Sequence, residues 1–531
     1  MRLFLFAGTL LIFLAFYKGD GGYHDLVNYL DDAEGLWLHG DMRRVEGIDE
    51  EERPDGSIVE HPIYGYSQYS LGLAFVSGPF VLLGKMADLV TGEKTVDDNG
   101  QTNLSPRARK IAVLIVPLFA ALTCLLIFEI GLLLGLSARA SLWSAMMLAV
   151  ASPLLSFARL YYTEVAVIFF TVMSFWAILR CHAATKDLPP LPPLFKGGMM
   201  WAAFWALVAG FGAAGAAGCH YAEAVMIAPL GMAMAVSVLL RRDATIGSRF
   251  MQLAALAAFP ILAGVAILGV NKYRHGSFTD TGYGSDVSEL ALKNIVGNAR
   301  FLISEHFREV SDKTHNQRQW IFEKPGLFLR NLWVLPAMIC LIPYRGLLEA
   351  LRGKSDKTGQ PATSRTGQGG IGSLPAGIRL SMSWLGTPEI LRAALLKGIV
   401  LQVLFWMCYS MLAFSPVRYF EPATGVLAIG LLFVGAKIES WLPRWGLIAA
   451  GFILIAWNLM FFFMNDDHNA PFAHDGPQSS LLIYTWYMEP FRNGLTDGYG
   501  TPIGATQWCW LAVLLGSGFV CWVMAWRRRD S

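Results

Sequence analysis

Long apolar stretches recur along the whole chain, and each is close to the length that a membrane-crossing helix needs. A helix requires about 20 mostly apolar residues to cross the hydrocarbon core of a bilayer. Twelve stretches fit this pattern, at residues 3–17, 111–134, 140–158, 162–181, 199–217, 221–240, 250–270, 326–344, 394–414, 420–437, 445–464 and 507–526. The pattern therefore predicts an all-α polytopic membrane protein, a bundle of about 12 transmembrane helices.

Composition agrees with a membrane location. Hydrophobic residues make up 54% of the 531-residue chain and charged residues 15%, whereas an ordinary soluble domain has about 25% charged residues. A soluble enzyme and a disordered protein are both excluded, and the net charge of +2 argues against nucleic acid as a partner. The seven cysteines lie in or beside apolar stretches without CxxC spacing, so we interpret them as packing residues.

The first apolar stretch, residues 3–17, has two interpretations. It is either a membrane anchor or a cleaved signal peptide. Only Arg2 precedes it, and no small-x-small cleavage site stands before Lys18. We expect an uncleaved anchor.

The distribution of basic residues predicts the orientation, because Lys and Arg accumulate on the cytoplasmic side. The segments 18–66 and 465–506 hold only 4 and 1 Lys/Arg, against 13 and 5 Asp/Glu. Seven other ends and connections together hold 21 Lys/Arg and 7 Asp/Glu, at residues 1–2, 135–139, 180–197, 241–249, 345–397, 437–444 and 527–531. We therefore expect both termini in the cytoplasm. The compact chain, without a retention signal, favours a bacterial inner membrane over the endoplasmic reticulum.

Residues 70–90 form a thirteenth apolar stretch, interrupted by Gly78, Pro79, Lys85 and Asp88. With a cytoplasmic N-terminus, the later loops fall on the expected sides only if this stretch does not cross. We interpret it as a juxtamembrane or re-entrant element on the outer face. If it crossed, the N-terminus would lie outside and residues 18–66 inside.

This topology makes residues 1–531 one integral membrane domain. Its cytoplasmic loop 345–392 is rich in Gly, Ser and Thr and is predicted to be a flexible linker. The outer face carries 18–110, with juxtamembrane helices, together with 271–325, 415–419 and 465–506. We expect the chemistry on this outer face.

A carboxylate follows the first span directly. Asp20 lies between Gly19 and Gly21, and the glycines allow the backbone to approach a ligand closely. A carboxylate at the outer membrane surface suits a general base that acts on a lipid-borne substrate. The alternatives are that Asp20 only ends a membrane helix, or that Asp25 is the base.

The short outer turns each carry polar residues, and most of them a cation beside an aromatic side chain. The candidates are Arg159, Glu164, His220, Lys272, Arg274, Arg418 and Tyr419. Individually, each can be an interfacial anchor. Together, they can form a cationic, aromatic-lined pocket for a phosphate headgroup on a long lipid.

Residues 24–38 have the periodicity of a short amphipathic helix on the membrane surface. Its Asp31 and Asp32 can join Asp20 or Asp25 in a divalent-metal site, but we favour solvated carboxylates on an interfacial helix. Two further motifs do not indicate a functional site. The GxGxxG match at 210–215 lies in a span and favours close helix packing, and the glycosylation sequon at Asn103 stands alone.

The order of these features resembles the GT-C superfamily of membrane glycosyltransferases, in particular the branch of the protein O-mannosyltransferases and the lipid A aminoarabinose transferase. The resemblance rests on Gly19-Asp20 with Tyr23, on His61-Pro62 through Gly72-Leu73-Ala74, on Ser156 to Glu164, on Asn271 to Ser277 and Thr281 to Gly284, and on Arg418-Tyr419 with Pro422.

The resemblance implies an enzyme that takes a sugar from a polyprenyl-phosphate carrier and passes it, with inversion, to a glycan, lipid or protein acceptor outside the membrane. It implies that Asp20 is the base, that Glu164 is the second acidic residue, and that Arg159, Lys272 and Arg418 meet the leaving phosphate. His61, His220, Arg274 and Tyr419 are further candidates for substrate binding. No cofactor is expected, although some relatives use a divalent ion.

This sequence departs from the family pattern in two places. Relatives often have two adjacent acidic residues near the base, whereas Gly21 follows Asp20 here. Relatives often carry Arg after the fifth span, where this chain has His220. Asp25 therefore stays open as the base.

Two other function classes compete with the glycosyltransferase. A transporter or flippase of lipid-linked glycans typically shows repeats and mid-membrane charges; here Glu129 is the clearest such charge and no repeat is visible. A membrane scaffold, or a polymerase or ligase from another superfamily, is the third hypothesis.

Overall fold

A computed structural model describes most of the chain. The described residues are 1–17, 24–41, 43–52, 58–66, 71–93, 95–96, 102–159, 161–183, 198–239, 245–279, 291–302, 307–312, 317–322, 328, 331–342, 388–408, 416–442, 445–464 and 505–527.

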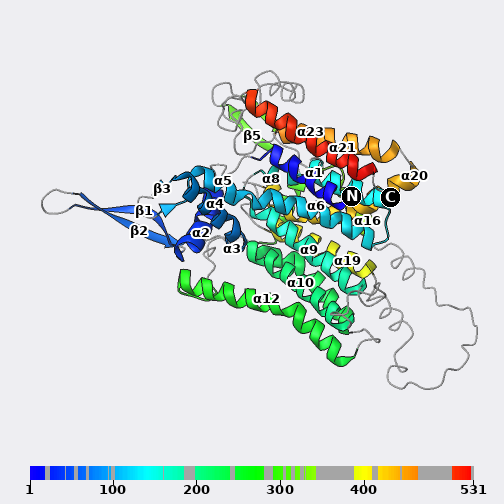
Figure 1. Cartoon of the computed structure of the whole chain (residues 1–531), viewed down its shortest axis with the longest axis horizontal. Helices are drawn as coiled ribbons and strands as arrows, with labels where there is room; N and C mark the ends of the chain where they lie inside the picture. The colour runs from blue at the N-terminus through cyan, green and yellow to red at the C-terminus, as the bar shows by residue number, and fades with distance from the viewer. Residues whose placement is uncertain are drawn as a thin grey trace, which may run out of the picture.

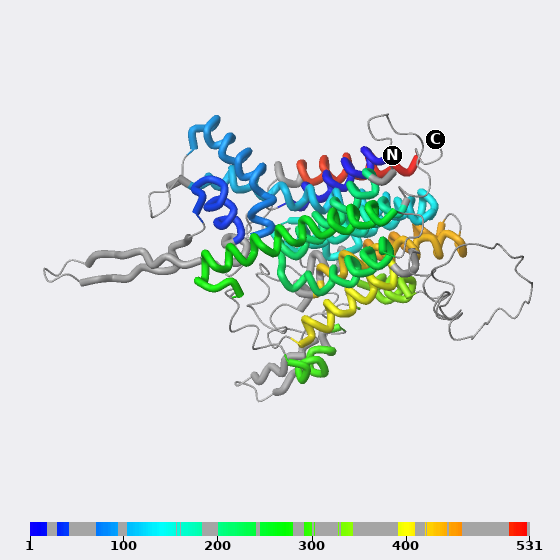
Figure 2. Tube along the Cα trace, turned by 90° about the horizontal axis from the view of Figure 1, so that it is seen from below, coloured from blue at the N-terminus to red at the C-terminus, as the bar shows by residue number. Residues whose placement is uncertain are grey.

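The described chain folds into a bundle of long apolar helices that run side by side (Figures 1 and 2). A helix occupies each of the twelve predicted stretches. The helices are α1 (Arg2–Ala15), α5 (Pro106–Val113) continuing into α6 (Ile115–Leu133), α7 (Ala138–Val150) followed by α8 (Leu154–Phe157), α9 (Thr163–Ala183), α10 (Gly198–Cys219), α11 (Ala224–Leu239), α12 (Ile246–His275), α16 (Val334–Leu341), α19 (Pro388–Met407), α20 (Pro416–Trp441), α21 (Trp445–Met464) and α23 (Ala505–Arg527). The predicted helical membrane bundle is confirmed.

Seven helical runs of the described chain are long and apolar enough to cross a membrane. They are Pro106–Leu133, Thr163–His182, Met200–Cys219, Tyr221–Leu239, Ile246–His275, Pro422–Trp441 and Cys509–Arg527. Three shorter apolar helices, Arg2–Ala15, Ala138–Val150 and Trp445–Asn458, complete this set. The bundle is thus polytopic, with fewer full-length spans among its described residues than the twelve predicted.

Small elements gather at one end of the bundle, which we call the α2 end (Figure 1). They are α2 (His24–Glu34), the π-helical turn η1 (Gly35–His39), α3 (Gly72–Val76) and α4 (Gly78–Thr91). The stretch 70–90 is therefore two helices of 5 and 14 residues, and neither has the roughly 20 residues that a crossing needs. One side of α4 packs on α5, while Leu82, Met86 and Leu89 on the other side are exposed.

Three antiparallel hairpins were not predicted from the sequence. They pair β1 (Arg43–Glu52) with β2 (Ile58–Tyr66), β3 (Thr95–Val96) with β4 (Thr102–Asn103), and β5 (Phe307–Asp312) with β6 (Gln317–Phe322). The β1 sequence, RRVEGIDEEE, is mostly charged, so it lacks the alternation of apolar and polar residues that identifies a half-buried strand.

Glycines let the helices approach one another closely. A Cβ on Gly212 would lie 2.6 Å from the Phe170 carbonyl oxygen of α9, and one on Gly210 would lie 2.2 Å from the Leu256 carbonyl oxygen of α12. The 210–215 stretch thus lets α10 pack closely against both α9 and α12. This agrees with its interpretation as a helix-packing motif. Gly398 of α19 meets the Met226 carbonyl oxygen of α11 in the same way, at 2.0 Å.

Candidate functional site

The candidate site lies at the α2 end, where α1, α10, α12 and α19 end and α9 and α11 begin. Only some of the predicted residues can be placed there. Asp20 lies outside the described residues. The backbones of Asp25 in α2, His61 in β2, and Arg418 and Tyr419 in α20 are placed, but their side chains are not described.

Two buried carboxylates lie close together at the start of α9 and α11. Glu164 is the second residue of α9, and its Oε2 accepts a hydrogen bond from the Thr163 hydroxyl at 3.2 Å. Glu223, in the short 3-10 turn Tyr221–Glu223, lies within electrostatic reach of Glu164. The Gln402 amide of α19 donates to Glu223 Oε1 at 2.6 Å. The structure therefore places the predicted Glu164 near a second acid, Glu223, which shares its outer turn with His220 and whose contact with Gln402 was not predicted.

His220 directly precedes this turn, at the end of α10. Its imidazole ring packs edge-on against the Trp406 indole of α19, with ring centroids 5.5 Å apart. This contact was not predicted, because the aromatic residue beside His220 in the sequence is Tyr221. The aromatic partner comes from a helix far away in sequence.

Arg159 joins the end of α1 to the start of α9. Its Nε donates to the Phe16 carbonyl oxygen at 3.2 Å. The next aromatic residue, Tyr161, is fully buried and donates from its hydroxyl to Ser77, between α3 and α4. Burial raises the pKa of the Tyr161 hydroxyl, so it acts as a neutral donor.

Lys272 and Arg274 point to different surroundings, although they are two residues apart. Residues two positions apart in an α-helix lie about 200° apart around its axis. Arg274 is buried and its Nη2 lies 3.7 Å from Asp32 Oδ2 of α2, with Tyr221 within electrostatic reach of both charges. Lys272 instead donates to the Gly276 carbonyl oxygen at 2.6 Å and is exposed. Arg274 thus belongs to the candidate site, whereas Lys272 caps its own helix.

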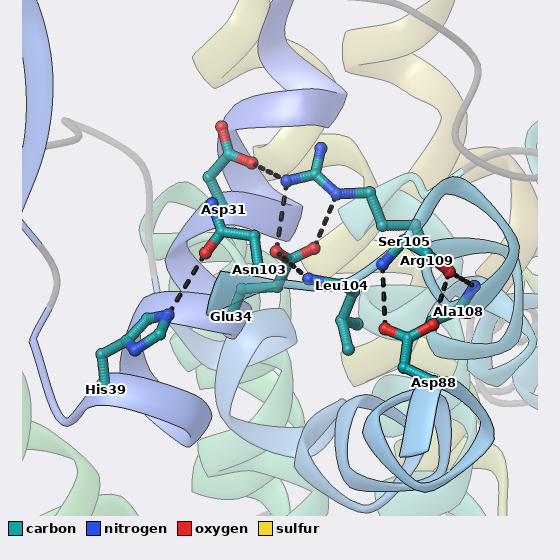
Figure 3. Close-up of polar contacts among 9 residues, drawn as sticks. All are labelled: Asp31, Glu34, His39, Asp88, Asn103, Leu104, Ser105, Ala108 and Arg109. Atoms are coloured by element: carbon teal, nitrogen blue, oxygen red, sulfur yellow. Dashed lines mark hydrogen bonds and ion pairs between the residues drawn. The ribbon is translucent and has the colours of Figure 1, made fainter. Parts of the chain in front are cut away.

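Asp31 and Glu34 of α2 both contact Arg109 of α5 (Figure 3). Arg109 Nε lies 2.8 Å from Glu34 Oε1, and Nη2 donates to Asp31 Oδ1 at 2.9 Å. Burial raises the pKa of Glu34 to about 7, although the Arg109 charge acts in the opposite direction. Sequence reasoning did not select Arg109, because no local pattern relates it to a helix 75 residues earlier.

The expectation of solvated carboxylates on this helix is wrong for Asp32. Its side chain is 0% exposed, since Arg274 compensates the charge and lets it be buried. Asp31, by contrast, is 33% exposed. The two neighbouring aspartates contact different arginines. Within the residues that the structure describes, no group of three or more His, Cys, Asp or Glu side chains could hold a metal ion.

The sequon at Asn103 is part of the same polar structure (Figure 3). Asn103 Oδ1 lies 3.2 Å from His39 Nε2. The third sequon residue, Ser105, is buried, hydrogen-bonds Asp88 through its hydroxyl and backbone N–H, and caps α5. Its hydroxyl therefore has a structural role at the start of α5.

Comparison with solved structures gives matches along most of the chain. ArnT from Cupriavidus metallidurans, bound to undecaprenyl phosphate, shows 13% identity and a TM-score of 0.45 over 98% of this chain and 76% of ArnT. AglB, an oligosaccharyltransferase from Archaeoglobus fulgidus in complex with an inhibitory peptide and a dolichol-phosphate, shows 11% identity and a TM-score of 0.41 over 95% of this chain and 56% of AglB. Both are members of the GT-C superfamily, which the sequence resembles.

No protein-family model matches the sequence, and no curated protein matches it. The structural matches have TM-scores below 0.5, and this chain spans about half the length of AglB. Residue roles are therefore argued below from the contacts of this chain alone.

Proposed function

We propose that this protein is a membrane glycosyltransferase that moves a hexosyl or pentosyl sugar from a polyprenyl-phosphate donor to an acceptor outside the membrane. The α2 end faces the outside in this proposal, and both termini lie in the cytoplasm of a bacterial cell. The acceptor is a glycan, a lipid or a protein. A lipid-borne donor is reached from the bilayer, which suits a chain composed mainly of apolar helices.

The observation that carries the proposal is the buried charge at the α2 end. Glu164, Glu223, Asp32 and Arg274 are each at most 7% exposed. Buried ionisable residues in a membrane bundle are costly and typically functional. Here residues from α2, α9, α12 and the turn before α11 bring both signs of charge to the same end of the bundle.

The residues that precede Asp20 in the sequence, Phe16 and Tyr17, lie at this charged end. Arg159 binds the carbonyl oxygen of Phe16, and the Tyr17 hydroxyl donates to the Lys110 carbonyl oxygen. Asp20 follows Tyr17 by three residues, and three residues span at most about 11 Å. The end of α1 thus lies beside Arg159, five residues before Glu164; Asp20 itself lies outside the described residues, and its part in the chemistry is proposed.

The proposed chemistry needs a base and fixed cations. Asp20 removes the proton from an acceptor hydroxyl, and the oxygen attacks the anomeric carbon from the face opposite the phosphate, which inverts the configuration. The bond between that carbon and the phosphate oxygen breaks, and the phosphate leaves on its lipid. Arg159 and Arg418 stabilise the charge that develops on the leaving oxygen. Glu164 and His220 bind sugar hydroxyls.

The transporter hypothesis is weakened by the surroundings of Glu129. This carboxylate lies near the end of α6, where it pairs with Arg180 of α9 at 3.1 Å and with Arg2 of α1. An acid held by two arginines from two other helices is suited to joining those helices. We therefore do not interpret Glu129 as a mid-membrane ion site.

The proposal is tested by comparing cells that contain wild-type protein, Asp20→Asn, Asp25→Asn or no protein. Mass spectrometry of surface glycans, envelope lipids and surface proteins should reveal a sugar present only with active protein. We expect Asp20→Asn to abolish this modification at equal protein abundance, because an amide cannot accept the proton. Asp25→Asn is the matched control.

Two outcomes would change the conclusion. If Asp25→Asn abolishes the sugar and Asp20→Asn does not, Asp25 is the base. If the sugar profile is the same with and without the protein, while a lipid-linked sugar accumulates on one side of the membrane, the flippase hypothesis replaces the transferase.

A further inference from the structure

Adjacent residues of α5 contact the end of α1 and α2, the two described segments that precede and follow residues 18–23 in the sequence. On the N-terminal side, the Tyr17 hydroxyl donates to the carbonyl oxygen of Lys110. On the C-terminal side, Arg109 binds Asp31 and Glu34 of α2. The beginning of α5 therefore joins the end of α1 to α2.

Arg109 makes this connection through one ion-pair contact and two hydrogen bonds. Its Nε lies 2.8 Å from Glu34 Oε1, and its Nη2 donates to Glu34 Oε2 at 3.2 Å and to Asp31 Oδ1 at 2.9 Å. The backbone N–H of Leu104 also donates to Glu34 Oε2 at 3.2 Å. A planar guanidinium can meet both oxygens of a carboxylate at once, whereas a lysine ammonium cannot match this geometry.

The pair is buried enough for its loss to matter. The Glu34 side chain is 2% exposed and that of Arg109 21%. Removing one partner of a buried ion pair leaves the other charge uncompensated and destabilises the contact strongly. A more exposed pair that involves another arginine of α5 offers a comparison, because Arg107 of α5 and Glu93, which follows α4, contact at 2.8 Å with side chains 79% and 35% exposed.

The start of α5 is itself firmly anchored. Ser105 caps the helix by accepting from the Ala108 N–H at 3.2 Å, and Asp88 of α4 accepts from the Ser105 N–H at 2.9 Å. The helices approach so closely here that a Cβ on Gly84 would lie 2.7 Å from the Ala108 carbonyl oxygen. Arg109 thus extends from a helix start that is held by its cap and by α4.

We propose that Arg109 is a positioning residue for sugar transfer, which holds α2 against α5 and thereby keeps Asp32 of α2 beside Arg274 in the candidate site. The role rests on the proposed function. Arg109 does not contact the reacting groups in this proposal. Its effect reaches the Asp32–Arg274 pair through Asp31, Glu34 and the backbone of α2.

The test uses the full-length protein reconstituted in liposomes, with the wild type, Arg109→Gln, Arg109→Lys and the control Arg107→Gln. Hydrogen–deuterium exchange of the peptide 24–34 reports the attachment of α2, and kcat and KM for the lipid-linked donor report catalysis. In Arg109→Gln we expect exchange of this peptide to rise and kcat to fall by about tenfold or more, with KM changed far less. Arg109→Lys should recover part of kcat, and Arg107→Gln should match the wild type.

The exchange measurement needs no sugar donor, so it tests the attachment of α2 independently of the proposed function. Unchanged exchange of 24–34 in Arg109→Gln overturns the attachment itself. Faster exchange with normal kcat overturns the positioning role alone, and so does an equal loss in Arg107→Gln. If the wild type transfers no sugar, the proposed function fails and the positioning role fails with it, even when exchange changes as expected.

Discussion

At the scale of single residues, the α2 end shows how a membrane protein keeps charges out of lipid. Two ion pairs there join different helices: Arg274 lies beside Asp32, and Arg109 beside Glu34. Such pairs cost desolvation energy and gain from mutual attraction, so their net effect on stability is small, but breaking one is costly. Their value lies in fixing which helices meet.

Glu34 provides a prediction about pH. Its pKa is raised to about 7 from an ordinary 4.5, so the docked α2 binds a proton more tightly than a detached α2. The docked state is therefore favoured below pH 4.5, and this contribution, roughly 3 kcal/mol, is lost as the pH rises through 7. Exchange of peptide 24–34, corrected for the intrinsic pH dependence, should show docking weakening across this range.

The same carboxyl responds to its neighbour. Because the Arg109 charge lowers the pKa of Glu34, Arg109→Gln should raise that pKa above 7. Infrared difference titration of the carboxyl band, assigned with Glu34→Gln, measures this shift. Arg107→Gln should leave the titration unchanged, and a lower pKa in Arg109→Gln would contradict the assignment of the cause.

At the scale of elements, glycines decide how closely helices pack. Membrane helices associate through close backbone approach rather than hydrophobic burial. Gly398 shows this for α11 and α19, because a Cβ built on it would lie 2.0 Å from the Met226 carbonyl oxygen. Gly269, in the lipid-facing part of α12, has no atom within 4 Å of a built Cβ.

The two glycines should therefore respond in opposite ways to alanine. Gly398→Ala forces α19 away from α11 and should destabilise the protein by about 1–3 kcal/mol. Gly269→Ala should be neutral or slightly stabilising, since alanine favours helix by roughly 0.5–1 kcal/mol. Thermal unfolding midpoints in one detergent compare them, and equal midpoints would show that the α11–α19 contact is looser than described.

At the scale of the whole molecule, the hydrophobic pattern predicted the helices but not what joins them. Spans are readable because lipid imposes a length and an apolar composition on each one. Glu164 and Arg274 were predicted because they stand at span ends, where a charge is conspicuous. Glu34–Arg109 and Glu223–Gln402 were not, since each partner is ordinary in its own segment and only tertiary packing joins them. Asp20, Arg418 and Tyr419 remain predictions.

The orientation is a prediction at this scale as well. Ser57 lies between β1 and β2, and Ser364 lies in the basic loop 345–392. With a cytoplasmic N-terminus, an impermeant thiol reagent added to intact cells should label Ser57→Cys and not Ser364→Cys, against the background of the parent protein. Permeabilised cells should label both. The reverse pattern would invert the topology and place the α2 end in the cytoplasm.

The central claim is that a sugar–phosphate bond is broken at the α2 end with Asp20 as the base. The most direct measurement is the release of polyprenyl phosphate from a panel of polyprenyl-phosphate sugars by the reconstituted protein, with the product's anomeric configuration determined by NMR. The account predicts release coupled to an inverted glycosidic bond, lost in Asp20→Asn. Retained configuration, or undiminished release in Asp20→Asn and in the Asp20→Asn/Asp25→Asn double variant, would contradict it.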